Sequence, residues 1–396
     1  MRVVLLLAMV VRRDNRRTTA DNVEMTRTPT RRVILAPDKF KGSLTAAEVA
    51  AALATGITRV APHSDVRRVP IADGGDGTVE AFVAAGWRKV ELTAPGPTGV
   101  DGVTSYAVLG TKAVVELASV VGAQRLPEGA LDALGASTFG LGVVLAHALE
   151  HGCTDIVLGL GGSSSTDGGA GMVRALGGRV LDMEGRDLPG GGAALVDAAA
   201  VDLTGLHPAI AAARFTLACD VDNPLLGLSG ATAIYAPQKG ATSTDLELLE
   251  RALTNWARLV GPEYADAPGA GAAGGTGFGA MAVLGARMRS GIEAILELLD
   301  FPTLLAGAEL VVTGEGSLDA QSLHGKAPVG VSKAARSAGV AAVAVAGRCL
   351  LGPNELRDAG FRTCHSLADL EPDLARSIAE APALLERIGE RIADKL

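Results

Sequence analysis

The chain has 396 residues, which is too many for one ordinary core and favours two domains. Apolar residues make up 48% of the chain and can fill such cores, although aromatic residues make up only 3%. The net charge is −8, and the Arg-rich first 32 residues leave the rest of the chain more acidic still. Because a nucleic-acid binder needs a basic face and stacking rings, this composition excludes that class of partner.

Residues 1–31 precede the first predicted strand and form an Arg-rich extension without periodicity. The apolar run over residues 3–11 is far shorter than the roughly 20 residues of a membrane span. Arg12 and Arg13 follow it without a clear cleavage site for a signal peptide. We therefore predict a cytoplasmic protein without a membrane segment. The extension is either disordered or artefactual, and a chain starting at Met25 should keep its fold and activity.

The first βα units follow this extension. Residues 33–36 read as a short buried strand, and a polar loop follows it over residues 37–42. Thr45 and Glu48 form a capping-box pattern before an Ala-rich helix that ends near Ile57. A second strand over residues 66–72 leads through a Gly-rich loop into a helix over residues 78–85. This alternation predicts a parallel sheet.

The middle of the chain differs, because residues 89–93, 102–109 and 112–117 read as consecutive strands without helices between them. They predict antiparallel hairpins in another layer or domain. A helix over 138–150, a strand over 155–160 and a helix from about Ala170 follow, and strands return over 309–313 and 340–346. The predicted fold is α/β, with a parallel-sheet domain interrupted by an inserted second domain. The first domain is assigned residues 32–80, 134–175 and 300–396, and the second is assigned residues 81–133 and 176–299.

Residues 161–169 form the most polar of the predicted loops, with three serines and a threonine among four glycines. The loop follows a strand and precedes a helix, so its N–H groups and hydroxyls could bind an anion. It is not a Walker A loop, because it contains no Gly-Lys-Ser/Thr. The alternative is a tight structural turn.

Two further loops carry carboxylates at the ends of predicted strands. Asp73 and Asp76 are three residues apart and could hold Mg²⁺ with water or orient a hydroxyl, unless they only cap a helix. Glu315 stands between two glycines after the strand over 309–313, and Lys326 downstream could meet a phosphate as a point charge. The alternative here is ordinary loop polarity.

Three other patterns give weaker evidence of function. Residues 269–274 match GxGxxG, but no buried strand precedes them, so a hinge or ligand loop is favoured over a nicotinamide site. His147 and His151 are four residues apart without the glutamate of HExxH, which favours an exposed helix face. The four cysteines have no CxxC spacing and are predicted to be free thiols.

Eight motifs in this order resemble the bacterial glycerate kinases that phosphorylate D-glycerate; they cover residues 36–44, 72–78, 161–163, 167–171, 218–225, 237–240, 268–275 and 313–316. The resemblance runs from residue 33 to beyond residue 347. It implies a flavodoxin-like domain and a second α/β domain with the active site between them, and it implies ATP and Mg²⁺ as cofactors. Residues 1–31 have no counterpart, and Thr166 replaces an asparagine associated with the family.

Roles are assigned by the chemistry of phosphoryl transfer, which demands positioning and charge neutralisation. The predicted catalytic residues are Lys41, Asp220 and Asp319, with Asp220 as the favoured base, and the predicted Mg²⁺ ligands are Asp73 and Asp76. Substrate and phosphate contacts are predicted for Asp38, Ser43, Gly161, Gly162, Ser163, Ser164, Ser165, Thr166, Asp167, Asn223, Gly274, Gly275, Gly314, Glu315, Ser322 and Lys326.

The predicted reaction transfers the γ-phosphoryl group of ATP to D-glycerate, with 2-phosphoglycerate favoured over 3-phosphoglycerate. A homodimer is a further expectation. Two other classes stay open from the sequence: a non-catalytic sugar-acid binding module and an NAD-dependent oxidoreductase. Incubation with ATP, Mg²⁺ and D-glycerate separates the three, since only the kinase forms ADP.

Overall fold

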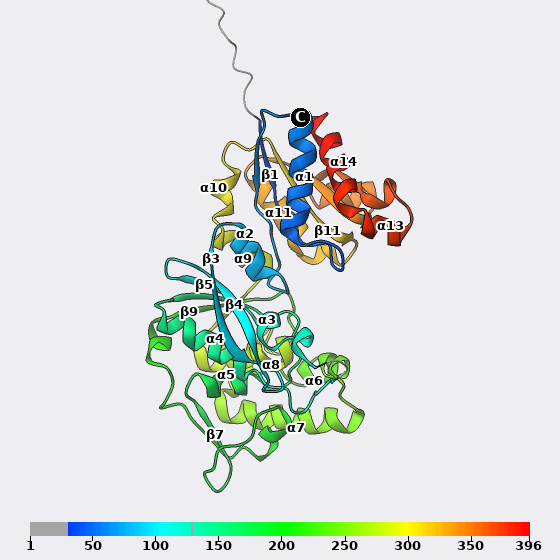
Figure 1. Ribbon diagram of the computed structural model, residues 1–396. Helices are drawn as coiled ribbons and strands as arrows, with labels where there is room; N and C mark the ends of the chain where they lie inside the picture. The colour runs from blue at the N-terminus through cyan, green and yellow to red at the C-terminus, as the bar shows by residue number, and fades with distance from the viewer. Residues whose placement is uncertain (1–30, 128–129) are drawn as a thin grey trace, which may run out of the picture. The chain divides into compact units, whose positions relative to one another are not determined.

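The computed structural model describes residues 31–127 and 130–396 (Figure 1). The predictions about the N-terminal extension and a start at Met25 fall outside the described residues. Residues Arg31–Leu396 form one compact unit, so the division into two domains stays a prediction. Within the described ranges, no helix is both long enough and apolar enough to cross a membrane.

The first sheet is parallel throughout and has the strand order β13-β12-β11-β1-β2. Its strands are β1 (Arg32–Leu35), β2 (Asp65–Arg68), β11 (Leu310–Leu318), β12 (Ala341–Cys349) and β13 (Phe361–Ser366). Numbered among themselves, they follow the flavodoxin-like order 2-1-3-4-5, so the predicted α/β class and parallel sheet are confirmed. The helices connected to these strands are α1 (Ala46–Val60), α11 (Ala327–Ser337), α12 (Pro353–Asp358), α13 (Leu374–Ala379) and α14 (Ala381–Ala393).

The second sheet is mixed and has the order β10-β9-β6-β5-β4-β3. The strands β3 (Arg88–Pro95), β4 (Asp101–Leu109) and β5 (Lys112–Glu116) form the predicted antiparallel hairpins, which are confirmed. The strands β6 (Asp155–Gly159), β9 (Arg214–Ala218) and β10 (Arg287–Arg289) continue it in parallel, and β7 (Arg179–Leu181) pairs separately with β8 (Ala200–Asp202). The assignment of residues 134–175 to the first sheet's domain is therefore wrong for β6, which pairs with β5 and β9.

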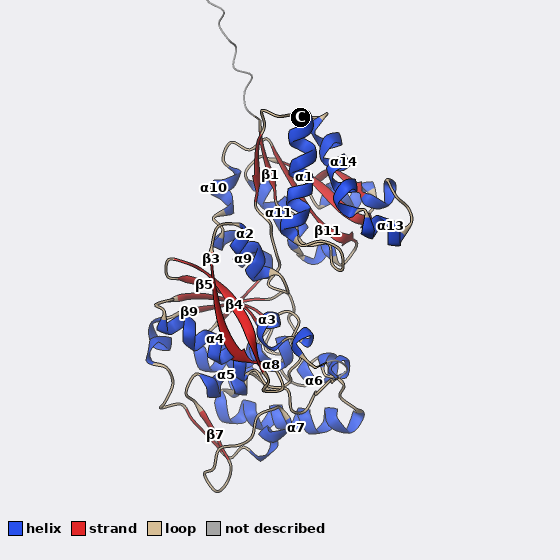
Figure 2. Cartoon of the chain, viewed as in Figure 1, coloured by secondary structure: helices blue, strands red, loops and turns tan. Residues whose placement is uncertain are grey.

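The remaining helices occur between residues 78 and 305, and Figure 2 shows the helices in blue. The predicted helices over 78–85, over 138–150 and from Ala170 are confirmed as α2, α4 and α5. The bounds are α2 (Thr78–Ala84), α3 (Leu117–Val121), α4 (Phe139–Glu150), α5 (Ala170–Ala175), α6 (Ala231–Tyr235), α7 (Ser243–Val260), α8 (Ala272–Leu284), α9 (Gly291–Leu298) and α10 (Phe301–Leu305).

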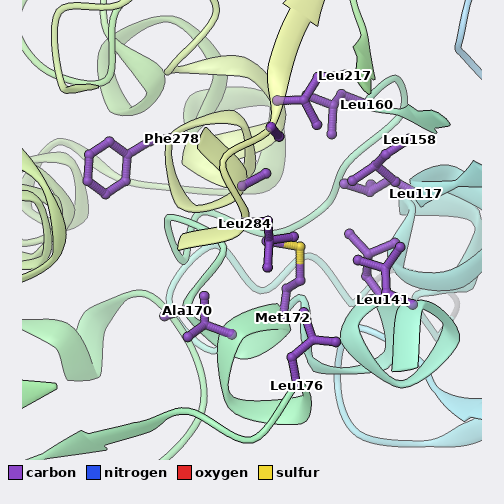
Figure 3. Close-up of a cluster of buried hydrophobic side chains, with 14 of the residues drawn as sticks. Leu117, Leu141, Leu158, Leu160, Ala170, Met172, Leu176, Leu217, Phe278 and Leu284 are labelled. Carbon is purple, nitrogen blue, oxygen red and sulfur yellow. The ribbon is translucent and has the colours of Figure 1, made fainter. Parts of the chain in front are cut away.

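Each sheet separates two apolar clusters, because successive side chains of a strand point to opposite faces. Val33 and Leu35 of β1 pack with α1 and α14, while Ile34 joins a cluster that also contains Phe82 and Val157. That second cluster holds side chains from both sheets and so packs them together. The largest cluster lies on the other side of the second sheet and includes Leu158, Leu217, Met172 and Phe278, which are labelled in Figure 3.

The helices α1 and α14 lie side by side (Figure 1). The predicted capping box of α1 is confirmed, since Thr45 and Glu48 exchange hydrogen bonds. Farther along α1, Gly56 lets the backbones approach so closely that a Cβ there would lie 1.9 Å from the Glu386 carbonyl oxygen. Arg59 then binds the Glu386 carboxylate across the contact at 2.7 Å. A glycine is therefore required at the centre of this helix pair.

Candidate active site

Asp38 and Glu315 meet where the order of the first sheet reverses, at the carboxyl ends of β1 and β11. The Asp38 N–H donates to the Gly314 carbonyl oxygen at 2.8 Å, which fixes the loop after β1 to β11. Open α/β sheets bind their ligands at such switch points. The sequence predicts a loop at Gly314 and Glu315, but both residues belong to β11. This strand continues to pair with β12 through Glu315↔Ala346.

The loop with Asp73 crosses the ends of β6 and β9 in the second sheet. The Gly74 carbonyl oxygen accepts from the Gly161 N–H at 3.4 Å. A Cβ on Gly159 would lie 2.2 Å from the Gly74 oxygen, and one on Gly291 would lie 2.0 Å from the Asp73 oxygen. Glycines on the second sheet and at the start of α9 therefore make room for this loop.

This crossing brings Asp73 near Asp220, which follows β9. One carboxylate oxygen of Asp220 accepts from the Gly291 N–H at 2.8 Å and from the Ser290 hydroxyl at 3.1 Å. Asp220 thus holds the first turn of α9, and its carboxylate is partly occupied by this contact.

Asp38, Asp73, Asp220 and Glu315 form an acidic cluster. Burial, followed by the negative charges of Asp73 and Glu315, raises the pKa of Asp38 to about 7, although Lys39 opposes this. Burial also raises the pKa of Asp220, and Asp73 adds to the effect. The pKa of Glu315 is raised by burial in the same way, and its buried Oε1 has no hydrogen-bond partner among the described residues. This cluster would gain stability from a bound cation.

A cavity of about 750 Å³ opens beside Asp38 and is lined by residues 38–48, 76–77, 80–81 and 124. Lys41 is exposed at this cavity. The Lys39 Nζ contacts the Asp76 Oδ2 at 3.1 Å, and so ties the two sides of the cavity together. Ser43 also lines the cavity, but its hydroxyl donates to the Ile378 carbonyl oxygen at 3.4 Å. The cavity therefore combines two lysines with acidic side chains.

The Ser-rich loop over residues 161–169 is divided into an open half and a buried half. Gly161, Gly162 and Ser163 keep exposed surface. The side chains of the next four residues are buried, so any contact of these residues with a ligand would have to come from the backbone; they are Ser164, Ser165, Thr166 and Asp167.

The buried half of the loop has structural partners. Asp167 accepts from the Thr138 N–H and hydroxyl at 2.8 Å each and from the Gly171 N–H at 3.1 Å, which holds the starts of α4 and α5. The Ser164 hydroxyl donates to the Val121 carbonyl oxygen at 2.8 Å. Buried polar groups need such partners, which Asp167 and Ser164 have, whereas the buried Thr166 hydroxyl has none among the described residues.

Lys239 has no role in the sequence-based site, although it lies in the resemblance motif 237–240. Its side chain is only 4% exposed. The Nζ donates to the Ser165 carbonyl oxygen and to the Ser163 hydroxyl, the latter at 3.4 Å. Burial lowers the pKa of Lys239 to about 7, while the negative charge of Asp167 opposes the shift. A charged residue at a motif position was the one available signal.

Gly274 and Gly275 are both buried against the Ser-rich loop. A Cβ on Gly274 would lie 2.0 Å from the Ser165 carbonyl oxygen, and one on Gly275 would lie 2.9 Å from the Gly168 Cα. The element directly before residues 269–274 is a short 3-10 helix over Pro262–Tyr264 and not a strand, so the nicotinamide fingerprint lacks its structural context.

Asn223, Asp319, Ser322 and Lys326 complete the predicted set. Asn223 donates to the Ser229 carbonyl oxygen at 2.8 Å within its own loop. Asp319 and Ser322 close a turn after β11, where the Asp319 N–H donates to the Ser322 hydroxyl at 3.0 Å. Lys326 lies 3.9 Å from Glu315 and so brings a positive charge to the acidic cluster.

Across residues 31–127 and 130–396, no three His, Cys, Asp or Glu side chains form a group that could hold a metal ion. A magnesium ion would therefore depend on one or two carboxylates together with water and substrate oxygens, as is usual for Mg²⁺ bound with a nucleotide.

The His147 ring contacts the Tyr106 hydroxyl at 2.9 Å on the partly exposed side of α4.

The model of the glycerate kinase family matches residues 33–396. A Bacillus subtilis protein named glycerate kinase is 39% identical over 369 residues, which cover 91% of this chain and 97% of that protein. An Escherichia coli protein named glycerate 2-kinase is 39% identical over 323 residues, covering 80% of this chain and 85% of its own. A crystal structure assigned to glycerate kinase 2 from Salmonella typhimurium LT2 matches with a TM-score of 0.82 at 37% identity, covering 92% of this chain and 98% of that one.

Proposed function

Since the chain belongs to the glycerate kinase family and is therefore an alcohol-group phosphotransferase, we propose that it transfers the γ-phosphoryl group of ATP to D-glycerate. The products are ADP and 2-phosphoglycerate, and the name of the Escherichia coli relative supports the 2-position. The observation that carries the proposal is the acidic cluster at the switch point beside a cavity with two lysines. The kinase assignment replaces the two other classes that the sequence left open, the non-catalytic binding module and the oxidoreductase.

Asp38 is the proposed base, in place of Asp220. Asp38 lines the cavity, and burial among carboxylates raises its pKa to about 7, so it can accept a proton at neutral pH. Asp220 already holds the Gly291 N–H and the Ser290 hydroxyl, which leaves it less free to approach a substrate. In the proposed step the glycerate hydroxyl gives its proton to Asp38 as its oxygen bonds to the γ-phosphorus. The bond from that phosphorus to the β-γ bridging oxygen breaks, and ADP leaves.

Lys41 is proposed to neutralise the charge of the transferring phosphoryl group or the substrate carboxylate, because it is exposed at the cavity that Asp38 lines. Lys326 would add a second positive charge from the side of Glu315. Such positioned charges act where charge develops in the transition state.

Asp73 and Asp76 are the proposed ligands of Mg²⁺. The negative charge of Asp73 bears on Asp38, Asp220 and Glu315, so a divalent cation there would relieve repulsion in the acidic cluster. Asp76 would have to exchange its contact with Lys39 to take part. When bound, the ion supplies charge neutralisation on the phosphate oxygens.

The test incubates the full chain with ATP, Mg²⁺ and D-glycerate and follows ADP release, while ³¹P–¹H correlation NMR identifies the phosphorylated carbon. ADP formation that needs D-glycerate, with phosphate on C2, is expected. ADP formation with phosphate on C3 would overturn the position alone, and no glycerate-dependent ADP would overturn the activity. Lys41→Ala should lower kcat/KM on the order of 10² to 10³-fold, whereas Lys333→Ala, at an exposed position on α11, is the matched control and should leave it unchanged.

A further inference from the structure

Lys239 is a buried lysine at the junction of two Gly-rich segments, and the proposed reaction does not yet use it. Its ammonium has as hydrogen-bond partners the Ser163 hydroxyl and the Ser165 carbonyl oxygen. Among the described residues no carboxylate forms an ion pair with it, and Asp167 acts on it only at longer range. A buried ammonium without a paired carboxylate costs stability, so its presence calls for a function.

The two Gly-rich segments are the Ser-rich loop over residues 161–169 and the start of α8. The start of α8 is strained where it meets Lys239. Ala273, Gly274 and Gly275 have consecutive left-handed backbones with φ of 52°, 66° and 85°. For a non-glycine residue such as Ala273 this conformation is unfavourable and persists only when its surroundings enforce it. A Cβ on Gly274 would lie 2.8 Å from the Lys239 Nζ, so the glycine lets the ammonium reach its position. The Ala273 carbonyl oxygen in turn accepts from the Ser163 hydroxyl at 3.3 Å.

Ser163 is the point where this buried arrangement reaches the surface. It keeps exposed surface, whereas the four side chains that follow it are buried. Its hydroxyl accepts a hydrogen bond from the ammonium and therefore presents its own proton as a donor. Within the protein the acceptors near that proton are the Ser165 and Ala273 carbonyl oxygens, both at 3.3 Å, and the Ser165 hydroxyl at 3.4 Å. An anionic oxygen would be a stronger acceptor.

Ser163 belongs to a loop that is hydrogen-bonded to a segment at the cavity wall. The Gly162 carbonyl oxygen accepts from the Ala123 N–H at 3.1 Å, and the following residue, Gln124, lines the cavity beside Asp38. The open half of the Ser-rich loop is thus hydrogen-bonded to the chain segment that carries Gln124 at the cavity wall.

We propose that Lys239 is a positioning residue whose buried ammonium orients the Ser163 hydroxyl as a hydrogen-bond donor to an anionic oxygen of a bound substrate. The anion is either a phosphate of the nucleotide or the carboxylate of glycerate. The inference rests on the proposed glycerate kinase reaction for its kinetic test, and a binding measurement tests it without turnover.

The experiment compares Ser163→Ala, Lys239→Met and the double variant with the wild type, measuring kcat and the KM for ATP and for D-glycerate separately. Each single change should raise the KM of the same one substrate on the order of tenfold or more. The double variant should be no worse than the worse single variant, because both remove one donor. A rise in the KM for ATP identifies a phosphate, and a rise in the KM for D-glycerate identifies the carboxylate.

Isothermal calorimetry with a non-hydrolysable ATP analogue, which carries all three phosphates, and with D-glycerate keeps the inference independent of turnover. The Kd of one of these ligands should weaken in Ser163→Ala and Lys239→Met alike, even if the wild type transfers no phosphate to glycerate. Effects that multiply in the double variant, or single variants that bind and turn over like the wild type, would overturn the inference. Should Lys239→Met fail to fold, unchanged KM and Kd values in Ser163→Ala alone would overturn it. Lys333→Met is the control for the loss of a lysine, since that residue is exposed on α11.

Discussion

Replacing Lys239 with methionine should change how the stability of the protein depends on pH. Burial lowers the pKa of Lys239 from 10.5 to about 7 in the folded chain, opposed by the charge of Asp167. The other groups at the ammonium, Ser163, Ser165 and Gly274, are uncharged. Between pH 7 and the unfolded value of 10.5, the unfolded chain holds a proton that the folded chain has released. Stability therefore rises with pH through this window.

The magnitude follows from the size of the pKa shift. Above the folded pKa, each pH unit adds up to about 1.4 kcal/mol to the free energy of unfolding. Because the folded lysine is about half protonated at pH 7, the gain between pH 7 and pH 9 is about 2 kcal/mol. Methionine does not titrate, so Lys239→Met should lack this gain.

Urea unfolding of the wild type and Lys239→Met at pH 7, 8 and 9 measures the effect. The difference in the free energy of unfolding should move by about 2 kcal/mol in favour of the wild type as pH rises. Groups that both proteins share, such as the buried thiol of Cys153, titrate in both and cancel in this difference. A difference that stays constant from pH 7 to pH 9 would show that Lys239 does not change protonation there, and the reasoning from its burial would be wrong.

Three further changes test separate parts of the molecule. Asp167→Asn puts an amide among N–H donors and should cost about 2–4 kcal/mol in urea unfolding, and an unchanged midpoint would contradict its structural role. Gly56→Ala should lower stability by more than about 2 kcal/mol because its Cβ meets the Glu386 carbonyl oxygen, with kcat/KM unchanged for the protein that stays folded. Asp73→Asn should raise the Mg²⁺ concentration needed for half-maximal rate, whereas Asp38→Asn should lower kcat by about 10² to 10⁴ at every Mg²⁺ concentration; identical Mg²⁺ curves for the two variants would contradict the division of roles.

Local features of the fold were predictable because their causes lie close together in the sequence. The capping box of Thr45 and Glu48 needs residues three apart, and the hairpins of β3, β4 and β5 need short turns between adjacent strands. The partner of β6 was not predictable in this way. Its apolar sequence suits a strand buried on both faces in either sheet, and its place is set by pairing with β9, some 60 residues later in the chain.

The same limit explains the extent of β11. A carboxylate between two glycines after an apolar run suggested a loop, yet Gly314 and Glu315 continue to pair with β12. The glycine serves the strand, because a Cβ on Gly314 would lie 1.7 Å from the Val345 carbonyl oxygen. Glu315 is thereby held at the switch point by regular backbone pairing, which positions its carboxylate more rigidly than a loop would.

The Ser-rich loop shows why polar composition can indicate a candidate loop but not which of its side chains stay accessible. A loop that approaches an anion needs N–H groups and hydroxyls, and a loop that bends into a protein needs the same groups to satisfy its buried backbone. Asp167 and Ser164 meet the second need, since their oxygens bind N–H and carbonyl groups of other segments. Among residues 161–169, only Ser163 has a side chain that is both partly exposed and in contact with a buried lysine. That charge belongs to Lys239, 76 residues farther along the chain, so the distinction between the two halves of the loop arises from tertiary packing and not from the loop's own sequence.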